Sequence, residues 1–448
     1  MTKSVGTTNL ETIDRARRTT AAENYDIGTR FPSVFASADG SWMTDVEGNR
    51  VLDLTAASGT LLLGNRHPVI VEALTACVRD YGAVFASTLT PQRIELAERL
   101  CERYPAGEKA VFCRTGSEAT TAAMRLARAA TGRDLILTSG YHGWHDWQLS
   151  YLRMGYEPAT RVANFAYNET VLARLLDEFA DEIAAVYVTP EPTWLDADYY
   201  RRLSALCARH GVLFMMDEVI TAVRYGPYGV NGTGEVPADV LTVGKGLSNG
   251  HGMSAVLGRR DVMDAFDDAV ISSAYSRDIM PMAVSLAVLD VIDDGTVLER
   301  TQRMGRMLKD GMRDVLASVG IPAYVDGPDM LFDVVLESDE LSWDIYRAAY
   351  DHGVWFEDSG TQMVTAAFGT AEVEHALDAF EKAARTVART RGHTSGALPE
   401  ERKTQFVAEA FGGRLRDTDE VLGQLDGFVE QIAKRDRSLV MELDQTCG

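Results

Sequence analysis

The chain has 448 residues, of which 46% are hydrophobic and 25% charged, and its formal net charge at pH 7 is −22. The length exceeds that of one simple domain and the composition is ordinary for a globular protein, so we expect two lobes with sizeable cores. The strong negative charge argues against binding to a nucleic-acid backbone, which requires a basic surface.

The cysteines and the hydropathy of the chain indicate in which cellular compartment the protein is expected. The 5 cysteines are scattered, odd in number and free of CxxC spacing, which argues against a disulfide framework or a zinc site and favours a reducing compartment. The N-terminus has no apolar core, and no run approaches about 18 consecutive apolar residues. We therefore expect a cytoplasmic protein without a signal peptide, a membrane span or a nucleic-acid partner.

The first predicted elements are an N-terminal arm and a short hairpin, whose apolar runs 42–46 and 50–54 flank the turn residues 47–49. From about 68 to 285, short apolar runs alternate with segments of helical period. This alternation implies crossover connections, and hence an α/β fold with a mostly parallel sheet covered on both faces. Buried strands are predicted at 110–113, 135–138, 184–189, 212–216, 241–243 and 254–258.

After residue 285 the predicted order becomes helix, strand, helix. A long amphipathic stretch covers roughly 285–318, an apolar run covers 330–336, and a further helix covers about 371–391. Residues 392–399 are predicted as a linker, and the charged tail beyond them as a helical extension packed on the body or on a partner subunit. The predicted domains are an N-terminal arm and small-domain segment (1–67), a large domain (68–285), a C-terminal small domain (286–391) and the extension (392–448).

The stretch 115–118 (Thr-Gly-Ser-Glu) has the spacing of a capping box. Thr115 is expected to accept a bond from the N–H of Glu118, whose side chain reaches back, in a helix that ends at Gly132. A well-capped helix is the simpler interpretation. The alternative is that the N–H groups of Gly116 and Ser117 bind a phosphate, aided by the helix dipole and by the small size of glycine.

The stretch 141–146 (Tyr-His-Gly-Trp-His-Asp) follows a predicted strand. Its aromatic rings suit stacking on a planar heterocycle. His142, His145 and Asp146 are also possible metal ligands, but their spacing is a weak signal outside a helix and the HExxH pattern is absent. We favour ring stacking and expect no metal.

Asp217, followed by Glu218 and Val219, ends one of the buried apolar runs. In open α/β sheets, ligands bind beyond the carboxyl ends of the strands. A carboxylate there could hold a proton on a pyridine nitrogen, which keeps the ring cationic and electron-withdrawing. A simple helix N-cap is the alternative role for Asp217.

Lys245 follows another buried run and stands between Gly244 and Gly246. Most lysines are solvated surface charges, but these glycines permit a ligand to approach this one. Desolvation beside a cationic cofactor lowers the pKa of a lysine amine and favours Schiff-base formation. The stretch is not a P-loop, because Asp239 stands where GxxxxGK[ST] requires glycine, and no dinucleotide fingerprint is present.

Taken together, these segments resemble the class-III, fold-type I pyridoxal-phosphate aminotransferases, especially the branch around glutamate-1-semialdehyde aminomutase. The resemblance spans about residues 28–390 and implies a large domain with a mostly parallel sheet and a smaller α+β domain built from both chain ends. The matching stretches keep the family's order and are 45–53, 63–68, 115–119, 125–128 with 131–133, 141–143, 217–219, 244–246 and 258–263.

The resemblance also implies roles for individual residues. Lys245 would form the Schiff base with pyridoxal 5'-phosphate and shuttle the proton, and Asp217 would pair with the pyridine nitrogen. Val219 and Tyr141 would lie on opposite faces of the ring. Further cofactor-binding residues implied by the resemblance are Gly116, Ser117, His142 and Glu191, the last where the family places an acidic active-site residue.

The chain departs from the family pattern at two places. Relatives carry a phosphate-binding threonine, lent by the neighbouring subunit of a dimer, where this chain has Ala274. Ser273 is the candidate for that role, and a less tightly held phosphate is the alternative. The segment 221–224 replaces the usual glycine-containing turn. Arg30 is a candidate carboxylate clamp because guanidinium binds carboxylates bidentately, and a plain surface arginine is the alternative.

We therefore predict a homodimeric transaminase with active sites at the subunit interface. It would transfer an amino group from an amino-acid donor to a small ketone or aldehyde that bears a carboxylate or lacks one. An intramolecular aminomutase and an amino-acid racemase remain alternatives. A catalytically idle cofactor-binding protein is a further alternative, against which the pairing of Lys245 with Asp217 argues.

Overall fold

The computed structural model describes residues 8–20, 31–82, 89–148, 155–358, 360–391 and 418–434, with side chains from residue 426 onward in the last range. It divides into two compact units. The first unit contains residues 1–76 and 287–399, so both flanks of the central region contribute to it. The second contains residues 77–286 and 400–448. The domain boundaries drawn from the sequence stay predictions.

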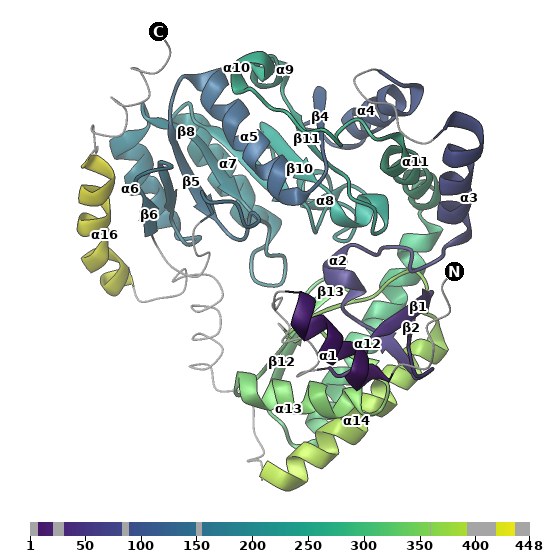
Figure 1. The fold of residues 1–448 in the computed structure, drawn as a ribbon. Helices are drawn as coiled ribbons and strands as arrows, with labels where there is room; N and C mark the ends of the chain where they lie inside the picture. The colour runs from purple at the N-terminus through teal and green to yellow at the C-terminus, as the bar shows by residue number, and fades with distance from the viewer. Residues whose placement is uncertain are drawn as a thin grey trace. The chain divides into compact units, whose positions relative to one another are not determined.

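An eight-stranded sheet forms the centre of the second unit (Figure 1). Five neighbouring strands are parallel, whereas β11 runs antiparallel to both of its neighbours and β6 runs antiparallel to β7. The predicted α/β fold with a mostly parallel sheet is confirmed, as are all six predicted strands. In spatial order the strands are β4 (Lys109–Cys113), β11 (Ser254–Gly258), β10 (Val240–Val243), β9 (Leu213–Glu218), β8 (Ile183–Val188), β5 (Leu135–Ser139), β7 (Val162–Asn164) and β6 (Gly155–Glu157).

Burial explains why these segments form strands. Every residue of β5, β8, β10 and β11 is buried, as expected for strands covered on both faces. Helix α5 (Gly116–Thr131) crosses β4, β11, β10 and β8, and α7 (Ala197–Arg209) packs on β9 (Figure 1). Other helices of the unit include α4 (Pro91–Arg103), α6 (Glu169–Phe179), α8 (Gly229–Thr233), α9 (Arg260–Met263), α10 (Phe266–Ala269) and η1 (Cys77–Tyr81).

The first unit contains two small sheets. The predicted hairpin is confirmed as β2 (Trp42–Asp45) and β3 (Arg50–Asp53), which β1 (Phe35–Asp39) and β14 (Val354–Trp355) extend. The second sheet joins β12 (Ala323–Asp326), β13 (Leu331–Leu336) and β15 (Thr361–Met363). The helices of the first unit include α1 (Asn9–Thr19), α2 (Ala56–Gly59), α3 (Pro68–Ala76), α12 (Thr296–Val319), α13 (Asp339–Tyr350) and α14 (Thr370–Arg391).

The single amphipathic stretch predicted at 285–318 was wrong, because the structure has two helices there. Helix α11 (Ile279–Asp293) ends before Gly295, which adopts φ +76°, and α12 begins directly after it. Asp294 also accepts a bond from Thr296 N at 2.9 Å, at the first residue of the new helix. A left-handed backbone at glycine breaks a helix even where the apolar period continues.

The C-terminal tail includes one described helix, α16 (Thr418–Ala433), which packs on α6 and β6 (Figure 1). Its buried side chains are Phe428, Val429 and Ile432. The predicted linker lies outside the described residues. In the described ranges, no helix has both the length and the apolarity needed to cross a membrane.

Candidate active site

Asp217, Lys245 and the N-terminus of α5 lie at the same edge of the large sheet of the second unit, where the parallel strands have their carboxyl ends. Strands β9 and β10 are parallel neighbours, and Thr242 on β10 is paired with Asp217 on β9. Lys245 therefore lies only three residues beyond the residue that is paired with Asp217. Strand β4 runs in the same direction as β10, because both are antiparallel to β11 between them. The N-terminus of α5, which follows β4, therefore opens at the same edge.

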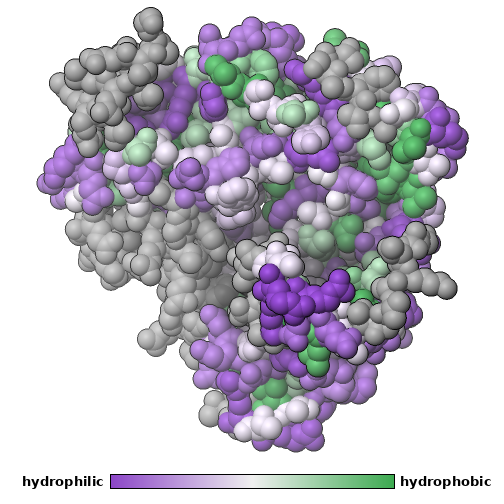
Figure 2. Space-filling view, in the orientation of Figure 1, coloured by the Kyte–Doolittle hydropathy of each residue, from purple (hydrophilic) through white to green (hydrophobic). Residues whose placement is uncertain are grey.

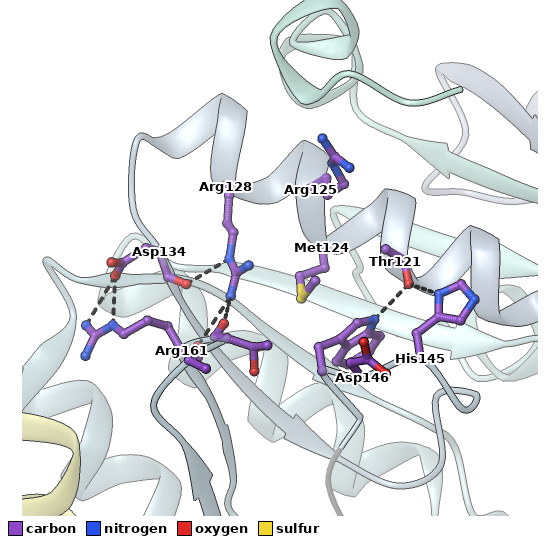
Figure 3. A pocket seen from close by; sticks show the side chains of 11 residues that line it. Thr121, Met124, Arg125, Arg128, Asp134, His145, Asp146 and Arg161 are labelled. Carbon is purple, nitrogen blue, oxygen red and sulfur yellow. Dashed lines mark hydrogen bonds and ion pairs between the residues drawn. The ribbon is translucent and has the colours of Figure 1, made fainter. Parts of the chain in front are cut away.

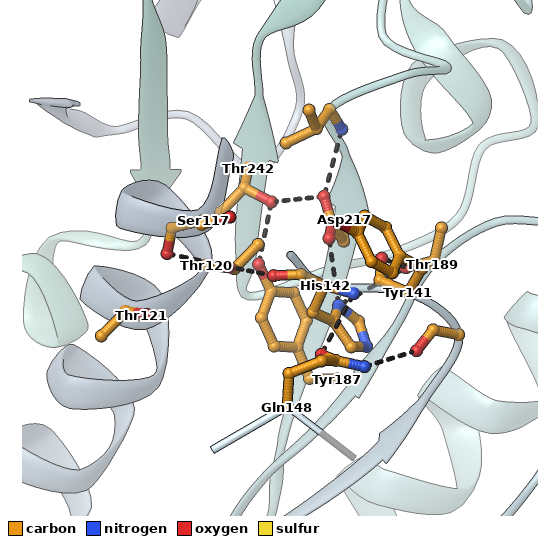
Figure 4. Close-up of polar contacts among 12 residues, drawn as sticks. Ser117, Thr120, Thr121, Tyr141, His142, Gln148, Tyr187, Thr189, Asp217 and Thr242 are labelled. Carbon is orange, nitrogen blue, oxygen red and sulfur yellow. Dashed lines mark hydrogen bonds and ion pairs between the residues drawn. The ribbon is translucent and has the colours of Figure 1, made fainter. Parts of the chain in front are cut away.

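Asp217 is held by three hydrogen bonds at the end of β9 (Figure 4). Its Oδ1 accepts from Thr242 Oγ1 at 3.0 Å and from Val219 N at 3.2 Å, and its Oδ2 lies 3.0 Å from His142 Nδ1. The side chain is almost completely buried. A carboxylate has about four acceptor positions, so one position on Oδ2 remains for a donor from a ligand.

Tyr187 and Thr242 complete this network, and the sequence analysis missed both. The hydroxyl groups of Tyr187 and Thr242 lie 2.8 Å apart. Because the carboxylate only accepts, the Thr242 hydroxyl donates to Asp217 and the Tyr187 hydroxyl donates to Thr242. Burial, with a contribution from Asp217, raises the pKa of Tyr187 well above its usual value, so its hydroxyl keeps the proton.

His142 lies beneath Asp217 and stacks on the ring of Tyr187, with centroids 4.5 Å apart. Its Nε2 is buried and makes no hydrogen bond within the described residues. Because a carboxylate only accepts, the bond between the two side chains carries its proton on Nδ1 of His142. His142 therefore holds Asp217 in place and leaves the remaining acceptor position of the carboxylate to a ligand.

The histidines of the 141–146 stretch have separate polar partners. His142 bonds Asp217, whereas Nδ1 of His145 lies 2.8 Å from Thr121 Oγ1. No group of three or more His, Cys, Asp or Glu side chains in the described part of the chain could hold a metal ion. Tyr141 is half-exposed, and its carbonyl accepts from Thr189 Oγ1 at 2.8 Å, which fixes its backbone at the end of β5.

The N-terminus of α5 has only half of the predicted capping box. Thr115 Oγ1 accepts from Glu118 N at 3.2 Å, but Glu118 Oε2 accepts from Arg114 N at 2.6 Å instead of from the N–H of Thr115. The prediction that Glu118 closes the box on Thr115 was therefore wrong. The carboxylate reaches one residue further, since the chain leaves β4 in an extended conformation at Thr115.

Ser117 lies in the first turn of α5 and is buried. Its Oγ accepts from Trp144 N at 3.3 Å, so its own proton is available to a ligand. Gly143 has φ +104°, and a Cβ there would overlap the Ser117 side chain. Glycine is therefore required at position 143 both for its backbone and for the close approach of this loop to the first turn of α5.

Val219 connects the other parts of the site. A Cβ added to Gly116 would lie 2.9 Å from Val219 Cγ1, and one added to Gly244 would lie 3.4 Å from it. Lys245 opens the short helix η2 (Lys245–Ser248) with φ +47°, a left-handed conformation that costs free energy for a residue with a side chain. Such strain is concentrated at functional sites.

The remaining predicted site residues are less closely tied to this network. The backbone of Glu191 accepts from Trp194 N and Leu195 N, and its N–H donates to Tyr200 Oη at 2.7 Å. Ser273 lies in a turn, where its carbonyl accepts from Ser276 N at 3.4 Å. Arg30 lies outside the described residues.

A separate cavity of about 610 Å³ runs along another face of α5 (Figure 3). None of the predicted site residues lines it. Arg128 lies within it and donates to the carbonyl of Asp134 at 2.8 Å, while Arg161 pairs with the Asp134 carboxylate at 3.2 Å. Its charges are thus largely committed to structural bonds, and the cavity is not the site formed by Lys245 and Asp217.

Comparison with known proteins decides the family. The model of the class-III aminotransferases matches residues 25–384. The chain belongs to this family. It is a pyridoxal-phosphate-dependent aminotransferase, and the predicted fold type, cofactor and enzyme class are confirmed.

Two curated relatives cover most of the chain. A 2'-deamino-2'-hydroxyneamine transaminase of Streptomyces kanamyceticus is 37% identical over 381 residues, which are 84% of this chain and 96% of the relative. A glutamate-1-semialdehyde 2,1-aminomutase of Methanothermobacter thermautotrophicus is 28% identical over 393 residues, 78% of this chain and 92% of the relative.

A solved structure agrees with the fold. The FumI protein of Sphingopyxis sp. MTA144, in its PLP internal aldimine form, superposes with a TM-score of 0.79 at 25% identity and covers 88% of this chain and 100% of that protein. The described residues of this chain fit the same cofactor. Asp217 has one open acceptor position for a ring N–H, and a Cβ at position 116 would lie only 2.9 Å from Val219 Cγ1, so the first turn of α5 has no room for a side chain there.

Proposed function

We propose that Lys245 binds the cofactor covalently through its amine and that Asp217 pairs with the pyridine nitrogen. The observation that carries this proposal is the open acceptor position on Asp217, a buried carboxylate fixed by three hydrogen bonds one strand away from Lys245. A carboxylate at this position would stabilise a protonated ring nitrogen by a charge-assisted hydrogen bond.

The other residues would orient the cofactor. Gly116 and Ser117 would bind its phosphate through backbone N–H groups and the Ser117 hydroxyl. Val219 and Tyr141 would pack on opposite faces of the ring, and His142 would hold Asp217 from beneath. Glu191 would be the acidic residue of the active site, and Ser273 would supply to the partner subunit the phosphate ligand that Ala274 lacks.

The bound cofactor withdraws electrons from the substrate carbon that carries the amino group. Lys245 would then act as general base and acid at that carbon. Proton transfer of this kind contributes about 10²–10⁴-fold to rate. Asp217 would keep the ring nitrogen protonated, because a hydrogen bond to a carboxylate favours the charged form of its donor.

For substrates, we propose an amino-acid donor and a small ketone or aldehyde acceptor. Arg30 is the proposed clamp for a carboxylate on either of them. The name of the Streptomyces relative describes a hydroxylated amine, so a polyhydroxylated carbonyl compound is the first acceptor to test. The net charge of −22 suits an amine-bearing substrate better than an anionic one.

Intramolecular amino transfer is the second candidate, because aminomutases are among the relatives. A mutase isomerises one aminated carbonyl compound without releasing a keto product. Racemisation, the third option in the sequence analysis, would exchange the α-hydrogen with solvent and also yield no keto product.

We also propose a cytoplasmic homodimer with active sites at the interface. Apolar side chains are exposed on η1 and α4 of the second unit, where Val78, Tyr81 and Ile94 are each about half or more exposed. Figure 2 shows hydrophobic side chains gathered near α3 of the first unit. Such a patch favours association. The described cysteines are free thiols, as a reducing compartment requires.

The covalent bond is tested by reducing the purified holoenzyme with borohydride and mapping its peptides by mass. We expect a pyridoxyl group on Lys245. The Lys245→Ala variant should lose at least 10³-fold in turnover, since both the covalent link and the proton carrier are gone. A label on another lysine, or near-normal turnover of the variant, would refute the assignment.

A panel of amino acids, given singly to the holoenzyme, identifies the donor by loss of the absorbance of the lysine-bound cofactor. Keto-acid release in amounts equal to the enzyme indicates transamination. Conversion of an aminated carbonyl compound without any keto product would establish the mutase instead.

A further inference from the structure

Glu218 is a completely buried carboxylate that the proposed chemistry does not use. It follows Asp217 in β9, and because side chains alternate along a strand, its carboxylate projects from the opposite face of the sheet. Its Oε2 accepts from Thr221 Oγ1 at 2.9 Å and from Val230 N at 2.6 Å, and its Oε1 accepts from Asn231 N at 2.6 Å. A buried charge is retained at such a cost only with bonds of this quality.

The three donors close the chain after β9 into a loop. Thr221 lies near the start of the loop, and Val230 and Asn231 lie at its end, in the first turn of α8. Gly229 has φ +62°, and a Cβ there would overlap the Glu218 carboxylate. The returning chain therefore passes directly over the carboxylate, which binds both ends of the loop 219–229.

This loop begins with Val219, which lies within contact distance of a Cβ added to Gly116 or to Gly244. The Val219 side chain thus lies between Gly116, in the proposed phosphate-binding turn, and Gly244, which precedes Lys245. Any displacement of the loop moves Val219 and so changes the spacing of these two glycines.

We propose that Glu218 is a positioning residue for the cofactor, because its carboxylate holds the loop 219–229 and so keeps Val219 against the ring. The inference rests on the proposed function, in which Val219 packs on one ring face. Glu218 itself contacts neither cofactor nor substrate and acts only through the loop.

The main test is the Glu218→Gln variant, which keeps the shape of the side chain but replaces one acceptor oxygen by a donor facing a backbone N–H. We expect the bound cofactor to show weaker visible circular dichroism, its dissociation constant to rise about tenfold, and kcat to fall about tenfold with KM for the donor nearly unchanged. The matched control is Asp45→Asn, because Asp45 is also buried and accepts from Glu47 N and Asn49 N in a hairpin turn of the other unit. It should lower only the melting temperature.

Two variants keep the test decisive where Glu218→Gln does not fold. Thr221→Val removes one donor without changing shape, and Gly229→Ala pushes on the carboxylate from the other side. Each should reduce the circular dichroism of the bound cofactor and lower kcat two- to fivefold. Normal kcat, cofactor affinity and circular dichroism in these variants, with only a lower melting temperature, would overturn the inference.

The inference and the proposed function fail in different ways. If borohydride leaves Lys245 unlabelled in the wild type, the proposed function is wrong and the role of Glu218 falls with it. If Lys245 is labelled normally and the loop variants match the wild type in all cofactor signals, only the positioning role is wrong.

Discussion

At the scale of single residues, the function depends on how neighbours hold one carboxylate. Asp217 has its side-chain conformation held by Thr242 and His142, which bond to different oxygens of the carboxylate. The Tyr187 hydroxyl donates to Thr242, and the Tyr187 ring stacks on His142. The four side chains, which come from three strands and one loop, therefore form a closed network around the Asp217 carboxylate (Figure 4). Removing one member leaves its partner buried without a bond, which typically costs about 1–3 kcal/mol.

The Thr242→Val variant tests this network. It keeps the shape of the side chain but removes the donor to Asp217 and leaves the Tyr187 hydroxyl unsatisfied. We expect the cofactor dissociation constant, measured by fluorescence titration, to rise about tenfold, since about 1.4 kcal/mol is a factor of ten.

Two further variants serve as controls for Thr242. Thr242→Ser retains the hydroxyl and should bind the cofactor nearly as the wild type does. Adding Tyr187→Phe to Thr242→Val removes the orphaned hydroxyl and should recover part of the lost stability. Equal affinity in the wild type and Thr242→Val would show that the threonine bond does not matter.

Glu218 gives a pH dependence of stability. Burial raises the pKa of its carboxyl from 4.5 to about 7, partly offset by the donors Asn231 N and Val230 N and reinforced slightly by Asp217. Because the folded pKa is the higher one, the stabilisation is fully present below pH 4.5 and is lost as the pH rises through about 7. The change amounts to about 3 kcal/mol.

Urea unfolding of the cofactor-free wild type and of Glu218→Gln, at pH values from 5 to 8, measures this effect. The unfolding free energy of the wild type, relative to that of the variant, should fall as the pH rises. Tyr104 and Tyr225, the other titratable groups near Glu218 besides Asp217, have raised pKa values and stay neutral over this range. A difference that is constant with pH would contradict the buried-carboxyl account.

At the scale of elements, α16 covers the edge of the large sheet. Strand β6 is its last strand, and edge strands with open backbone groups invite unwanted pairing. Phe428, Val429 and Ile432 pack this helix on α6 and β6, and Arg161 donates to the carbonyl of Ile432 at 3.4 Å. The same arginine pairs with Asp134 and Glu182, so the last turn of α16 is joined to an existing ion-pair cluster.

The Phe428→Ala variant should release α16 from the sheet. Loss of a buried phenylalanine costs about 3 kcal/mol, which is large compared with the stability of one docked helix. We expect faster amide hydrogen exchange in β6 and faster proteolytic removal of the tail, with turnover unchanged. Glu430→Ala, on the exposed side of the same helix, is the matched control and should leave both rates unchanged.

At the scale of the whole molecule, association is the property to test. The Val78→Asp variant places a charge in the exposed apolar patch of η1 and α4, where Val78 is 61% exposed. We expect sedimentation analysis to show a dimer for the wild type and mostly monomer for the variant, with turnover lost in parallel because Ser273 is proposed to serve the partner's site. Leu10→Asp, an equally exposed leucine on α1, should stay dimeric. A monomeric wild type would refute the homodimer.

The sequence by itself determined the strands of the large sheet, the hairpin, and the four motifs around Lys245 and Asp217. These features depend on local patterns, namely short apolar runs, capping residues and glycines. Such patterns can be recognised in the sequence without knowledge of the tertiary structure. The helix break at Gly295 and the bond that Glu118 accepts from Arg114 N are also local features. They could not be predicted, because the spacing of apolar residues does not determine the backbone angles at these positions.

Only the tertiary structure decided how Asp217 is held and what lies behind it. Tyr187, Thr242 and His142 are separated from it by 30, 25 and 75 positions in the chain. The sequence indicated His142 as a site residue but not as a partner of Asp217, and it did not indicate Tyr187 or Thr242. The same is true of Glu218, whose bonds to the loop arise from a strand end and a returning turn. Contacts between distant segments follow from strand order and register, which a single sequence leaves open because many pairings bury the same apolar runs.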